Sequence, residues 1–344
     1  MNHFNLAFLG FGNVGQALAR LLLGKREELQ NRYGITFTVT GIATGRHGTV
    51  VDLNGIDLER ALASLAAGGP LAGLAAAPGL SLDDFIATCG AQVLFESIPV
   101  NYATGQPAVD YLRAALERGM HAVSANKGPV VHAYQELTAL ARARGVKYYF
   151  EAAVMDGAPI FSLFRETLPG ISLRGFRGIL NSTTNLILTR MEAGESFDKA
   201  VKHAQSIGIA ETDPSGDIDG WDAAVKVAAL VTVLMEVPLK PQQVDRTGIG
   251  AITQAEIARA KEAGKRWKLV CTARREGQGV IGRVAPEMVG PDSPLYGVTG
   301  TDSIVQFETD VLPGLTILET HPGTETTAYG LLADFLNAVG AHRT

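Results

Sequence analysis

Hydrophobic positions in the first 43 residues follow two different periods. Residues 4–9, FNLAFL, and 35–43, ITFTVTGIA, are short apolar runs rich in β-branched and aromatic residues, which predicts strands. Residues 16–24, QALARLLLG, repeat leucine and alanine at helical spacing. The segment GFGNVG at 10–15 separates the first strand from this helix. The order strand, glycine turn, helix, strand is typical of a parallel α/β sheet.

The same alternation continues to about residue 150. Residues 91–99 and 121–129 are predicted to be strands that end in polar turns, with the helical pattern of 107–119 between them. Ligands of doubly wound sheets bind beyond the carboxyl ends of the strands. The polar residues at these ends are Glu96, Ser97, Asn126 and Lys127. Lys127 is therefore either a ligand contact within its turn or a plain surface charge.

Beyond residue 150 the alternation stops, which predicts a domain boundary. Residues 173–191 predict a strand, a polar turn and a helix, and residues 196–210 predict an amphipathic helix. The expected fold class is therefore α/β, with an N-terminal Rossmann domain and a mixed α/β domain after it.

The segment GFGNVG has the GxGxxG spacing of dinucleotide-binding turns. In that motif Gly10 permits a tight turn, Gly12 lets the backbone approach a pyrophosphate, and Gly15 allows the helix to pack on the strand. A glycine cluster without a ligand is the alternative, but the flanking strand and helix favour a nucleotide. The residues expected to bind the cofactor here are Gly10, Phe11, Gly12, Asn13, Val14 and Gly15.

The residues after the second strand indicate the type of nicotinamide cofactor. NAD-specific folds carry an acidic residue there for the ribose 2′-hydroxyl, whereas this chain has Thr44, followed by Arg46 and His47. Because a guanidinium binds a 2′-phosphate well, NADP is favoured and NAD is the second choice. The alternative is that Arg46 is a solvated loop charge.

Residues 211–226, ETDPSGDIDGWDAAVK, combine five carboxylates with one lysine. Read from Ser215, the segment matches the third, fifth and sixth positions of a calcium-binding loop. The match fails at both ends, because such a loop begins with an acid and ends with a bidentate glutamate, and this segment has Ser215 and Lys226 there. Calcium is therefore not the expected partner of these acids.

Asp222 and Lys226 lie four residues apart on a helix that is predicted to start near Asp219 or Gly220. One interpretation is a routine surface pair. The rest of this helix is apolar, so it is expected to be largely buried and its one charged turn to open on a cleft. A buried lysine loses proton affinity and becomes a candidate acid or base.

Composition narrows the classes of function. The chain has 344 residues, enough for two domains, with 46% hydrophobic residues and a formal net charge of −5. No basic patch suits nucleic acid, so a small polar ligand is expected. Neither a signal peptide nor an apolar run of about 18 residues is present, so we expect no membrane contact and a cytoplasmic location. Cys89 and Cys271 lack metal spacing and are expected to be buried packing residues.

Several motifs together resemble homoserine dehydrogenase, over essentially the whole chain. They are GFGNVG, SANKGP, FEAAV, GILNSTTNLILTRM, SIGIAETDPSGDIDGWDAAVKVAAL and TTAYGLLADFL. The resemblance implies reversible reduction of L-aspartate 4-semialdehyde to L-homoserine by NADPH or NADH, in the aspartate pathway to threonine and methionine. It also implies a homodimer. The expected domains are a nucleotide domain over 1–150, a catalytic and dimerisation domain over 151–320, and a C-terminal helix over 321–344 that returns to the nucleotide domain.

The resemblance also implies roles for single residues. Lys226 is the acid and base, Asp222 orients the substrate hydroxyl or the lysine, and Lys127 helps to bind substrate and cofactor. Glu211 holds the substrate amino group. The further residues expected around the substrate or cofactor are Asp217, Thr183, Ser97 and Gly323.

Two segments depart from the family pattern. A glycine-rich turn that holds a monovalent cation such as sodium reads VMDGAP here, and Asp156 adds a charge to it. The residues that match the cation site are Glu151, Val154, Asp156 and Ala158. A closing glycine-rich segment is replaced by ETHPGTETTAYG, which retains Gly323. We expect neither an ACT regulatory domain nor an aspartate kinase fusion.

Two other classes of protein fit part of the sequence. One is another NAD(P)-dependent dehydrogenase of a related amino-acid aldehyde, such as aspartate semialdehyde dehydrogenase, which needs an activated cysteine nucleophile. The other is a nonenzymatic NADP-binding sensor. The intact Lys127, Asp222 and Lys226 argue against the sensor.

Overall fold

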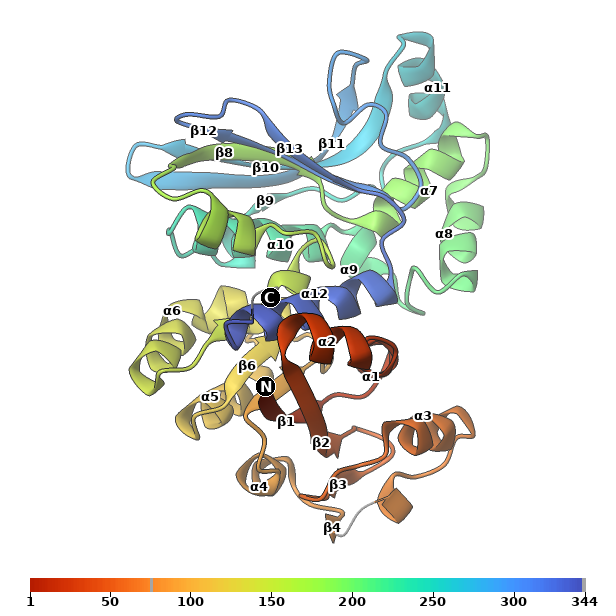
Figure 1. The fold of residues 1–344 in the computed structure, drawn as a ribbon. Helices are drawn as coiled ribbons and strands as arrows, with labels where there is room; N and C mark the ends of the chain where they lie inside the picture. Colours follow the sequence, from red (N-terminus) through yellow and green to blue (C-terminus); the bar gives the residue numbers. More distant parts are fainter. Residues whose placement is uncertain (75–76, 342–344) are drawn as a thin grey trace. The chain divides into compact units, whose positions relative to one another are not determined.

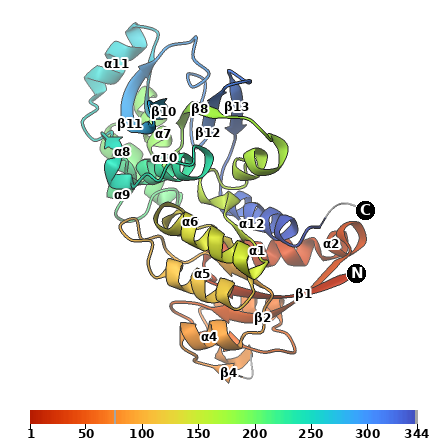
Figure 2. The ribbon, with the colours of Figure 1, turned by 90° about the vertical axis from the view of Figure 1, so that its left-hand side faces the viewer.

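The computed structural model describes residues 1–74 and 77–341, and the chain divides into two compact units (Figures 1 and 2). The nucleotide unit comprises Met1–Pro159 and the chain from Gly323 onward, and the second unit comprises Ile160–Pro322. The segment just after residue 150 stays with the nucleotide unit because it packs tightly on the last helix. A Cβ at Gly157 would lie 2.5 Å from the carbonyl oxygen of Thr326.

A seven-stranded sheet forms the centre of the nucleotide unit, in the order β4-β3-β2-β1-β5-β6-β7 (Figure 1). Its parallel strands are β1 (Asn2–Leu9), β2 (Ile35–Ala43), β5 (Val93–Glu96), β6 (His121–Ser124) and β7 (Tyr148–Tyr149). The first four confirm the predicted strands. At one end of the sheet, β3 (Thr49–Val51) pairs antiparallel with β2 and with β4 (Ala77–Pro78), and neither of these two short strands was predicted. Because β1 pairs with β2 on one side and β5 on the other, the strand order reverses there, which is where such sheets bind ligands.

Helices cover both faces of this sheet, which explains why its strands are apolar runs without alternation. Along β1, Leu6 and Phe8 belong to one hydrophobic cluster, and Ala7 and Leu9 belong to the other. The helices of the unit are α1 (Asn13–Gly24), α2 (Arg26–Tyr33), α3 (Leu58–Ala66), α4 (Leu82–Thr88), α5 (Ala108–Glu117), α6 (Lys127–Arg144) and α12 (Thr324–Ala338), with short helical turns at η1 (Ala72–Leu74) and η2 (Glu151–Ala153).

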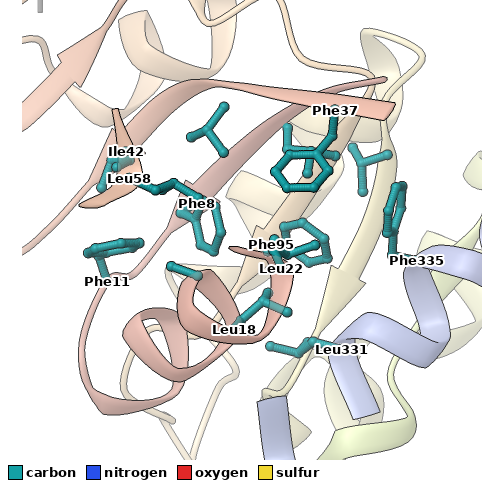
Figure 3. Packing of buried hydrophobic residues seen from close by; sticks show 14 of the residues in the cluster. Phe8, Phe11, Leu18, Leu22, Phe37, Ile42, Leu58, Phe95, Leu331 and Phe335 are labelled. Carbon is teal, nitrogen blue, oxygen red and sulfur yellow. The ribbon is translucent and has the colours of Figure 1, made fainter. Parts of the chain in front are cut away.

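The last helix, α12, completes the core of the nucleotide unit. Figures 1 and 2 show it beside α1, and Figure 3 shows Leu331 and Phe335 with Leu18 of α1 in one cluster. The ring of Phe335 meets the rings of Phe4 and Phe95 edge-on, with centroids 5.9 Å apart in both pairs. Each buried side chain of this size contributes about 1.5–3 kcal/mol of burial free energy. Helix α12 is therefore structurally part of the nucleotide unit.

The second unit is built on a six-stranded sheet in the order β13-β12-β8-β10-β11-β9. Its strands are β8 (Leu173–Ile179), β9 (Asp245–Arg246), β10 (Arg266–Glu276), β11 (Gly279–Val289), β12 (Ser303–Thr309) and β13 (Leu315–Glu319). All neighbours are antiparallel except β9 and β11. Its helices are α7 (Ser182–Glu192), α8 (Phe197–Ser206), α9 (Ser215–Ile218), α10 (Trp221–Leu234) and α11 (Gln254–Glu262), with short turns at η3 (Leu163–Thr167) and η4 (Pro241–Gln243).

Helix α10 is the central helix of the second unit and packs on β10 and β11. It begins after Gly220, which has a φ of +79° and caps it, close to the predicted start. Residues 222–225 and 227–232 are buried, as expected for a helix that is apolar on all sides. Across residues 1–74 and 77–341, no helix is long and apolar enough to cross a membrane.

Candidate functional site

The glycine turn between β1 and α1 is tight at two positions and open at one. Gly10 has a φ of +98°, and a Cβ there would lie 2.7 Å from the carbonyl carbon of Ser97. A Cβ on Gly15 would lie 2.6 Å from the carbonyl oxygen of Gly10. No atom lies within 4 Å of a Cβ built on Gly12. The turn therefore leaves its backbone accessible at Gly12, as the approach of a pyrophosphate requires.

The side chains next to the glycines hold the turn in place. The ring of Phe11 is buried and meets Phe8 edge-on at 5.2 Å, so only its backbone is available to a ligand. Ser97, at the end of β5, donates its hydroxyl to the carbonyl of Gly10 at 3.2 Å. Residues 13–14 form the first turn of α1, where Asn13 is exposed.

The loop after β2 presents an exposed guanidinium. Thr44 closes the loop, because its hydroxyl donates to the carbonyl of Gly48 at 3.0 Å and accepts from the amide of His47 at 2.7 Å. His47 Nδ1 lies 3.0 Å from the carbonyl of Gly69. Arg46 is exposed at the tip of the loop and forms no ion pair with any described residue. The loop therefore presents Arg46, and not His47, as its cation.

Glu96 is a fully buried carboxylate at the carboxyl end of β5. It accepts hydrogen bonds from the amide of Ile98 at 2.9 Å, from the Ser124 hydroxyl, and from Nδ2 of Asn126 at 3.2 Å. Burial raises the pKa of Glu96 to about 7, although these three hydrogen bonds lower it in part. The carboxylate thus joins the ends of β5 and β6.

The same network fixes the start of α6, which carries Lys127. Asn126 caps this helix, because its Oδ1 accepts from the amide of Gly128 at 2.9 Å. Its Nδ2 is held by Glu96 at 3.2 Å. Lys127 is the first residue of α6 and is half-buried. Sequence reasoning placed Glu96 at the strand end but missed its role as the anchor of this turn.

The raised pKa of Glu96 predicts a pH-dependent stability. The native carboxyl keeps its proton up to about pH 7, whereas the unfolded chain releases it near the ordinary value of 4.5. The unfolded chain binds fewer protons in this interval, so the free energy of unfolding falls as the pH rises through it. For the unchanged protein, this fall in the free energy of unfolding is roughly 2–3 kcal/mol between about pH 5 and pH 8. We expect it to be absent in Glu96→Gln, because the glutamine side chain does not titrate. Urea unfolding at a series of pH values measures the difference.

The matched control is Glu117→Gln, which neutralises an exposed carboxylate on α5. It should follow the pH profile of the unchanged protein. If Glu96→Gln also followed that profile, the carboxyl would be ionised in the native state at neutral pH.

In the second unit, Lys226 and Asp222 are paired on α10. Lys226 Nζ lies 3.2 Å from Oδ2 of Asp222 and donates to the carbonyl of Leu180 at 2.7 Å. The side chains of the lysine and the aspartate are 16% and 9% exposed, so this is not a solvated surface pair. The loop between β8 and α7 therefore holds the ammonium from one side, and the α10 carboxylate holds it from the other.

Asn181 connects this pair to a second carboxylate. Its Nδ2 donates to Asp222 Oδ2 at 3.0 Å and to Asp217 Oδ1 at 2.6 Å. Its Oδ1 accepts from the amide of Thr184 at 2.8 Å, which caps α7. Sequence reasoning missed Asn181 as a member of the site. An asparagine between a predicted strand and a predicted helix was the available signal, because asparagine is a preferred cap.

Two carboxylates and one ammonium give this cluster an excess of negative charge. Burial and the neighbouring charge of Asp222 raise the pKa of Asp217. Hydrogen bonds from Asn181 and Thr183, together with the charge of Lys226, act in the opposite direction and lower the pKa of Asp217. A second cation near Asp217 would relieve the repulsion between the two carboxylates. The cluster is therefore suited to a ligand with an ammonium group.

Thr183 and Glu211, the other residues expected near the substrate, differ in their contacts with this cluster. Thr183 is buried, and its hydroxyl donates to the carbonyl of Ile209 at 3.2 Å. Glu211 is exposed, and its carboxylate has no hydrogen bond or ion pair with a described residue. Its backbone carbonyl accepts from Gln205 Nε2 at 3.2 Å. Thr183 therefore belongs to the cluster through Asp217, whereas among residues 1–74 and 77–341 no hydrogen bond or ion pair joins Glu211 to it.

The segment expected to hold a cation lies against α12 in the nucleotide unit. Glu151 is buried, and its amide donates to Asp334 Oδ2 at 2.6 Å. Asp156 has a φ of +43°, and its carboxylate accepts from the Thr326 hydroxyl at 3.0 Å. Gly323 precedes the first turn of α12. The described residues contain no group of three His, Cys, Asp or Glu side chains placed for a metal.

Both cysteines are buried, as expected. Burial raises the pKa of Cys271 to about 12 and also raises the pKa of Cys89. A nucleophilic cysteine needs a lowered pKa and access to the substrate. These two thiols therefore do not fit the cysteine-dependent class of aldehyde dehydrogenase.

Comparisons with known proteins cover almost the whole chain. The model of the homoserine dehydrogenase NAD-binding domain matches residues 10–151, and the homoserine dehydrogenase model matches residues 159–336. An NAD(+)-dependent homoserine dehydrogenase from Pseudomonas canavaninivorans is 36% identical over 342 residues, which are 98% of this chain and 96% of that protein.

Solved structures agree with these matches. A putative homoserine dehydrogenase from Archaeoglobus fulgidus has a TM-score of 0.87 and 30% identity, over 98% of this chain and 100% of that one. A hyperthermophilic archaeal homoserine dehydrogenase in complex with NADPH has a TM-score of 0.83 and 28% identity, over 98% of each chain.

The glycine turn where the strand order reverses and the half-buried pair of Lys226 and Asp222 now have a common explanation. The chain is an NAD(P)-dependent oxidoreductase that acts on a CH–OH group. Both family models match, and the relatives align over nearly their full length. The chain belongs to the homoserine dehydrogenase family, which confirms the resemblance seen in its motifs.

Proposed function

We propose that the chain interconverts L-homoserine and L-aspartate 4-semialdehyde, with Lys226 as the proton donor and acceptor. The observation that supports this most is the position of the half-buried Lys226, whose Nζ lies 3.2 Å from Asp222 and 2.7 Å from the Leu180 carbonyl. The nicotinamide cofactor supplies or accepts the hydride when it is bound. During reduction, the Lys226 ammonium stabilises the negative charge that develops on the substrate oxygen and protonates it. During oxidation, the neutral amine removes the hydroxyl proton.

The carboxylates are proposed to recognise the other end of the substrate. The excess negative charge around Asp217 supports its contact with the substrate ammonium, and the exposed carboxylate of Glu211 is proposed to join it. Thr183 borders the substrate, and Asp222 orients Lys226. In the nucleotide unit, Lys127 binds substrate and cofactor from the turn that Glu96 and Asn126 hold.

The experiment that tests this function follows the reduction of NADP and NAD with L-homoserine at alkaline pH. L-Threonine and L-serine serve as comparison alcohols. Activity that is confined to homoserine supports the proposed reaction. If the protein bound NADPH but oxidised none of the three alcohols, the substrate would be a different one and the assignment of the carboxylates would fail.

Cofactor preference depends on Arg46 in this proposal. We propose NADP as the preferred cofactor, because an exposed guanidinium after β2 suits a 2′-phosphate. The relative from Pseudomonas canavaninivorans is named as NAD(+)-dependent, which favours NAD instead. Glycine-turn backbone, Ser97 and Gly323 are proposed to contact either cofactor.

Arg46→Ala is expected to lower kcat/KM for NADP relative to NAD by about 10- to 100-fold, the value of a lost charge-assisted hydrogen bond. Steady-state kinetics with both cofactors measure the ratio. Arg60→Ala, which removes an exposed guanidinium on α3, is the matched control. An unchanged ratio in the Arg46 variant would mean that Arg46 does not bind the 2′-phosphate.

We also propose a monovalent cation such as sodium at the segment before the domain boundary. The ligands are the Glu151 carboxylate and the carbonyls of Val154, Asp156 and Ala158. An all-oxygen set of this kind suits a hard cation. The cation would hold this segment in its bent conformation, in which Asp156 has a positive φ.

Assembly, location and pathway are the remaining parts of the proposal. A cytoplasmic homodimer in the aspartate pathway, which leads to threonine and methionine, fits the family and the free cysteines. Exposed apolar side chains on β11 and β13, among them Ile281 and Leu318, support a dimer surface on the second unit. The net charge of −5 argues against nucleic acid as a partner.

A further inference from the structure

A cavity in the second unit is not used by the proposed reaction. Its volume is about 220 Å³. It lies where the end of α7, α11, the start of β10 and the loop before β12 meet. Its charged lining consists of Glu192, Lys261, Lys265 and Arg266, and Trp267 and Tyr296 form aromatic walls. None of these residues has a role in the reaction proposed above.

The lining has an excess of positive charge. Three cations, Lys261, Lys265 and Arg266, face one carboxylate, Glu192, so the excess is two positive charges at neutral pH. Concave sites lined by charges of one sign concentrate ligands of the opposite sign. The charge therefore favours a ligand with two negative groups.

Glu192 provides a site for a positive group within the same cavity. Its Oε2 lies 3.7 Å from Nε of Arg266. Its Oε1 is buried and accepts no hydrogen bond from the described residues. The Glu192 side chain is 17% exposed and lines the cavity, so a positive group in the cavity can pair with its carboxylate. Burial raises the pKa of Glu192, and the charges of Lys268, Arg266 and Lys261 oppose this shift.

The nearby lysine inside the protein does not supply the missing donor. Lys268 is fully buried beside the cavity. Its Nζ donates to Asn185 Oδ1 at 3.1 Å and to the Val298 carbonyl at 2.6 Å. The Lys268 ammonium therefore has other acceptors, and its charge adds to the positive field around Glu192.

Tyr296 holds one of the three cations, Arg266, in place. The Arg266 guanidinium lies 4.7 Å from the centroid of the Tyr296 ring and also donates to the Tyr296 carbonyl at 3.3 Å. Trp267 Nε1 donates to the Glu256 carbonyl at 3.1 Å, which leaves its ring as an apolar wall. The Arg266 side of the cavity is therefore ordered before binding, which lowers the entropy lost when a ligand enters.

The volume limits the size of the ligand. At about 30 Å³ for each molecule of liquid water, the cavity holds the equivalent of roughly seven waters. Drug-sized pockets begin at about 300 Å³. We propose that this cavity binds an acidic amino acid, with its ammonium on the Glu192 carboxylate and its two carboxylates on Lys261, Lys265 and Arg266.

Trp267 reports directly on binding. The chain has two tryptophans, Trp221 and Trp267, so a Trp221→Phe protein leaves the cavity residue as the only indole. We expect a saturable fluorescence change on titration with L-aspartate or L-glutamate at low salt. Succinate has two carboxylates but no ammonium, and should bind about ten-fold more weakly or worse. Inorganic phosphate should not compete at comparable concentrations.

Two variants in the same background test the two ends of the ligand. Glu192→Gln and Lys265→Ala should each weaken amino-acid binding by about ten-fold or more. Lys202→Ala, which removes an exposed lysine on α8, should not change it. Because Lys265 is exposed, its variant tests the site even if the Glu192 variant folds poorly.

Enzyme kinetics distinguish binding at this cavity from binding at the cluster of Asp217, Asp222 and Lys226. Glu192→Gln should leave homoserine oxidation unchanged while it weakens the fluorescence response. No saturable response to either amino acid would overturn the proposal. So would equal binding of aspartate, succinate and phosphate that is insensitive to Glu192→Gln, which would indicate a nonspecific anion site.

Discussion

Lys226→Ala is expected to lower homoserine turnover by about two to four orders of magnitude, the usual contribution of a general acid or base. The Lys226 ammonium lies between the Leu180 carbonyl at 2.7 Å and Asp222 at 3.2 Å, and alanine leaves no proton donor there. Affinity for NADPH should remain nearly unchanged, because the glycine turn and Arg46 belong to the nucleotide unit. Initial rates of homoserine oxidation and a fluorescence titration with NADPH measure the two quantities.

Two further variants separate proton transfer from charge. Lys226→Arg keeps the positive charge beside Asp222, but a guanidinium does not release its proton in a protein, so homoserine oxidation should stay low. Lys199→Ala removes an exposed lysine of α8 and should keep full activity. Turnover in Lys226→Ala that is close to that of the unchanged protein would exclude Lys226 as the acid and base.

The strands that the sequence predicts are those buried on both faces. β1, β2, β5 and β6 are apolar runs because helices cover both sides of their sheet, and such runs stand out without any knowledge of neighbours. The last two strands at one end of the sheet, β3 and β4, are only three and two residues long. Segments of that length have no period to detect, and their pairing depends on tertiary contacts.

Part of the candidate site was predictable because it is local in sequence. Asp222 and Lys226 meet at 3.2 Å because helical spacing brings residues four apart together. The partners from other elements were not predictable from spacing. Asn181 reaches Asp222 across 41 residues, and the Leu180 carbonyl reaches Lys226 across 46. A backbone carbonyl leaves no signal in residue identity, so that contact requires the fold.

The family resemblance and the residue patterns therefore contribute different information. The motifs identify the chemistry of the chain, whereas the structure shows which groups hold the reacting side chains. Glu96 is an example, since its position at a strand end was visible but its three hydrogen bonds and its raised pKa depend on complete burial. Asn126 and the start of α6 depend on it in turn.

Gly10→Ala and Gly12→Ala are expected to act on different properties of the same turn. At Gly10 an alanine must adopt a φ near +98° and place its Cβ 2.7 Å from the Ser97 carbonyl carbon. The strained backbone costs about 1–2 kcal/mol and the overlap with β5 a further 1–3 kcal/mol. Urea unfolding of the nucleotide unit should therefore show a loss of roughly 2–5 kcal/mol.

Gly12→Ala is the matched substitution, because nothing lies within 4 Å of a Cβ built there. Its stability should stay within about 1 kcal/mol of that of the unchanged protein. Its affinity for NADPH should nevertheless fall by about ten-fold or more, since the added methyl group occupies the space where the pyrophosphate approaches the backbone. A fluorescence titration with NADPH measures this change. Normal NADPH affinity in a fully folded Gly12→Ala protein would mean that the pyrophosphate does not approach the turn at Gly12.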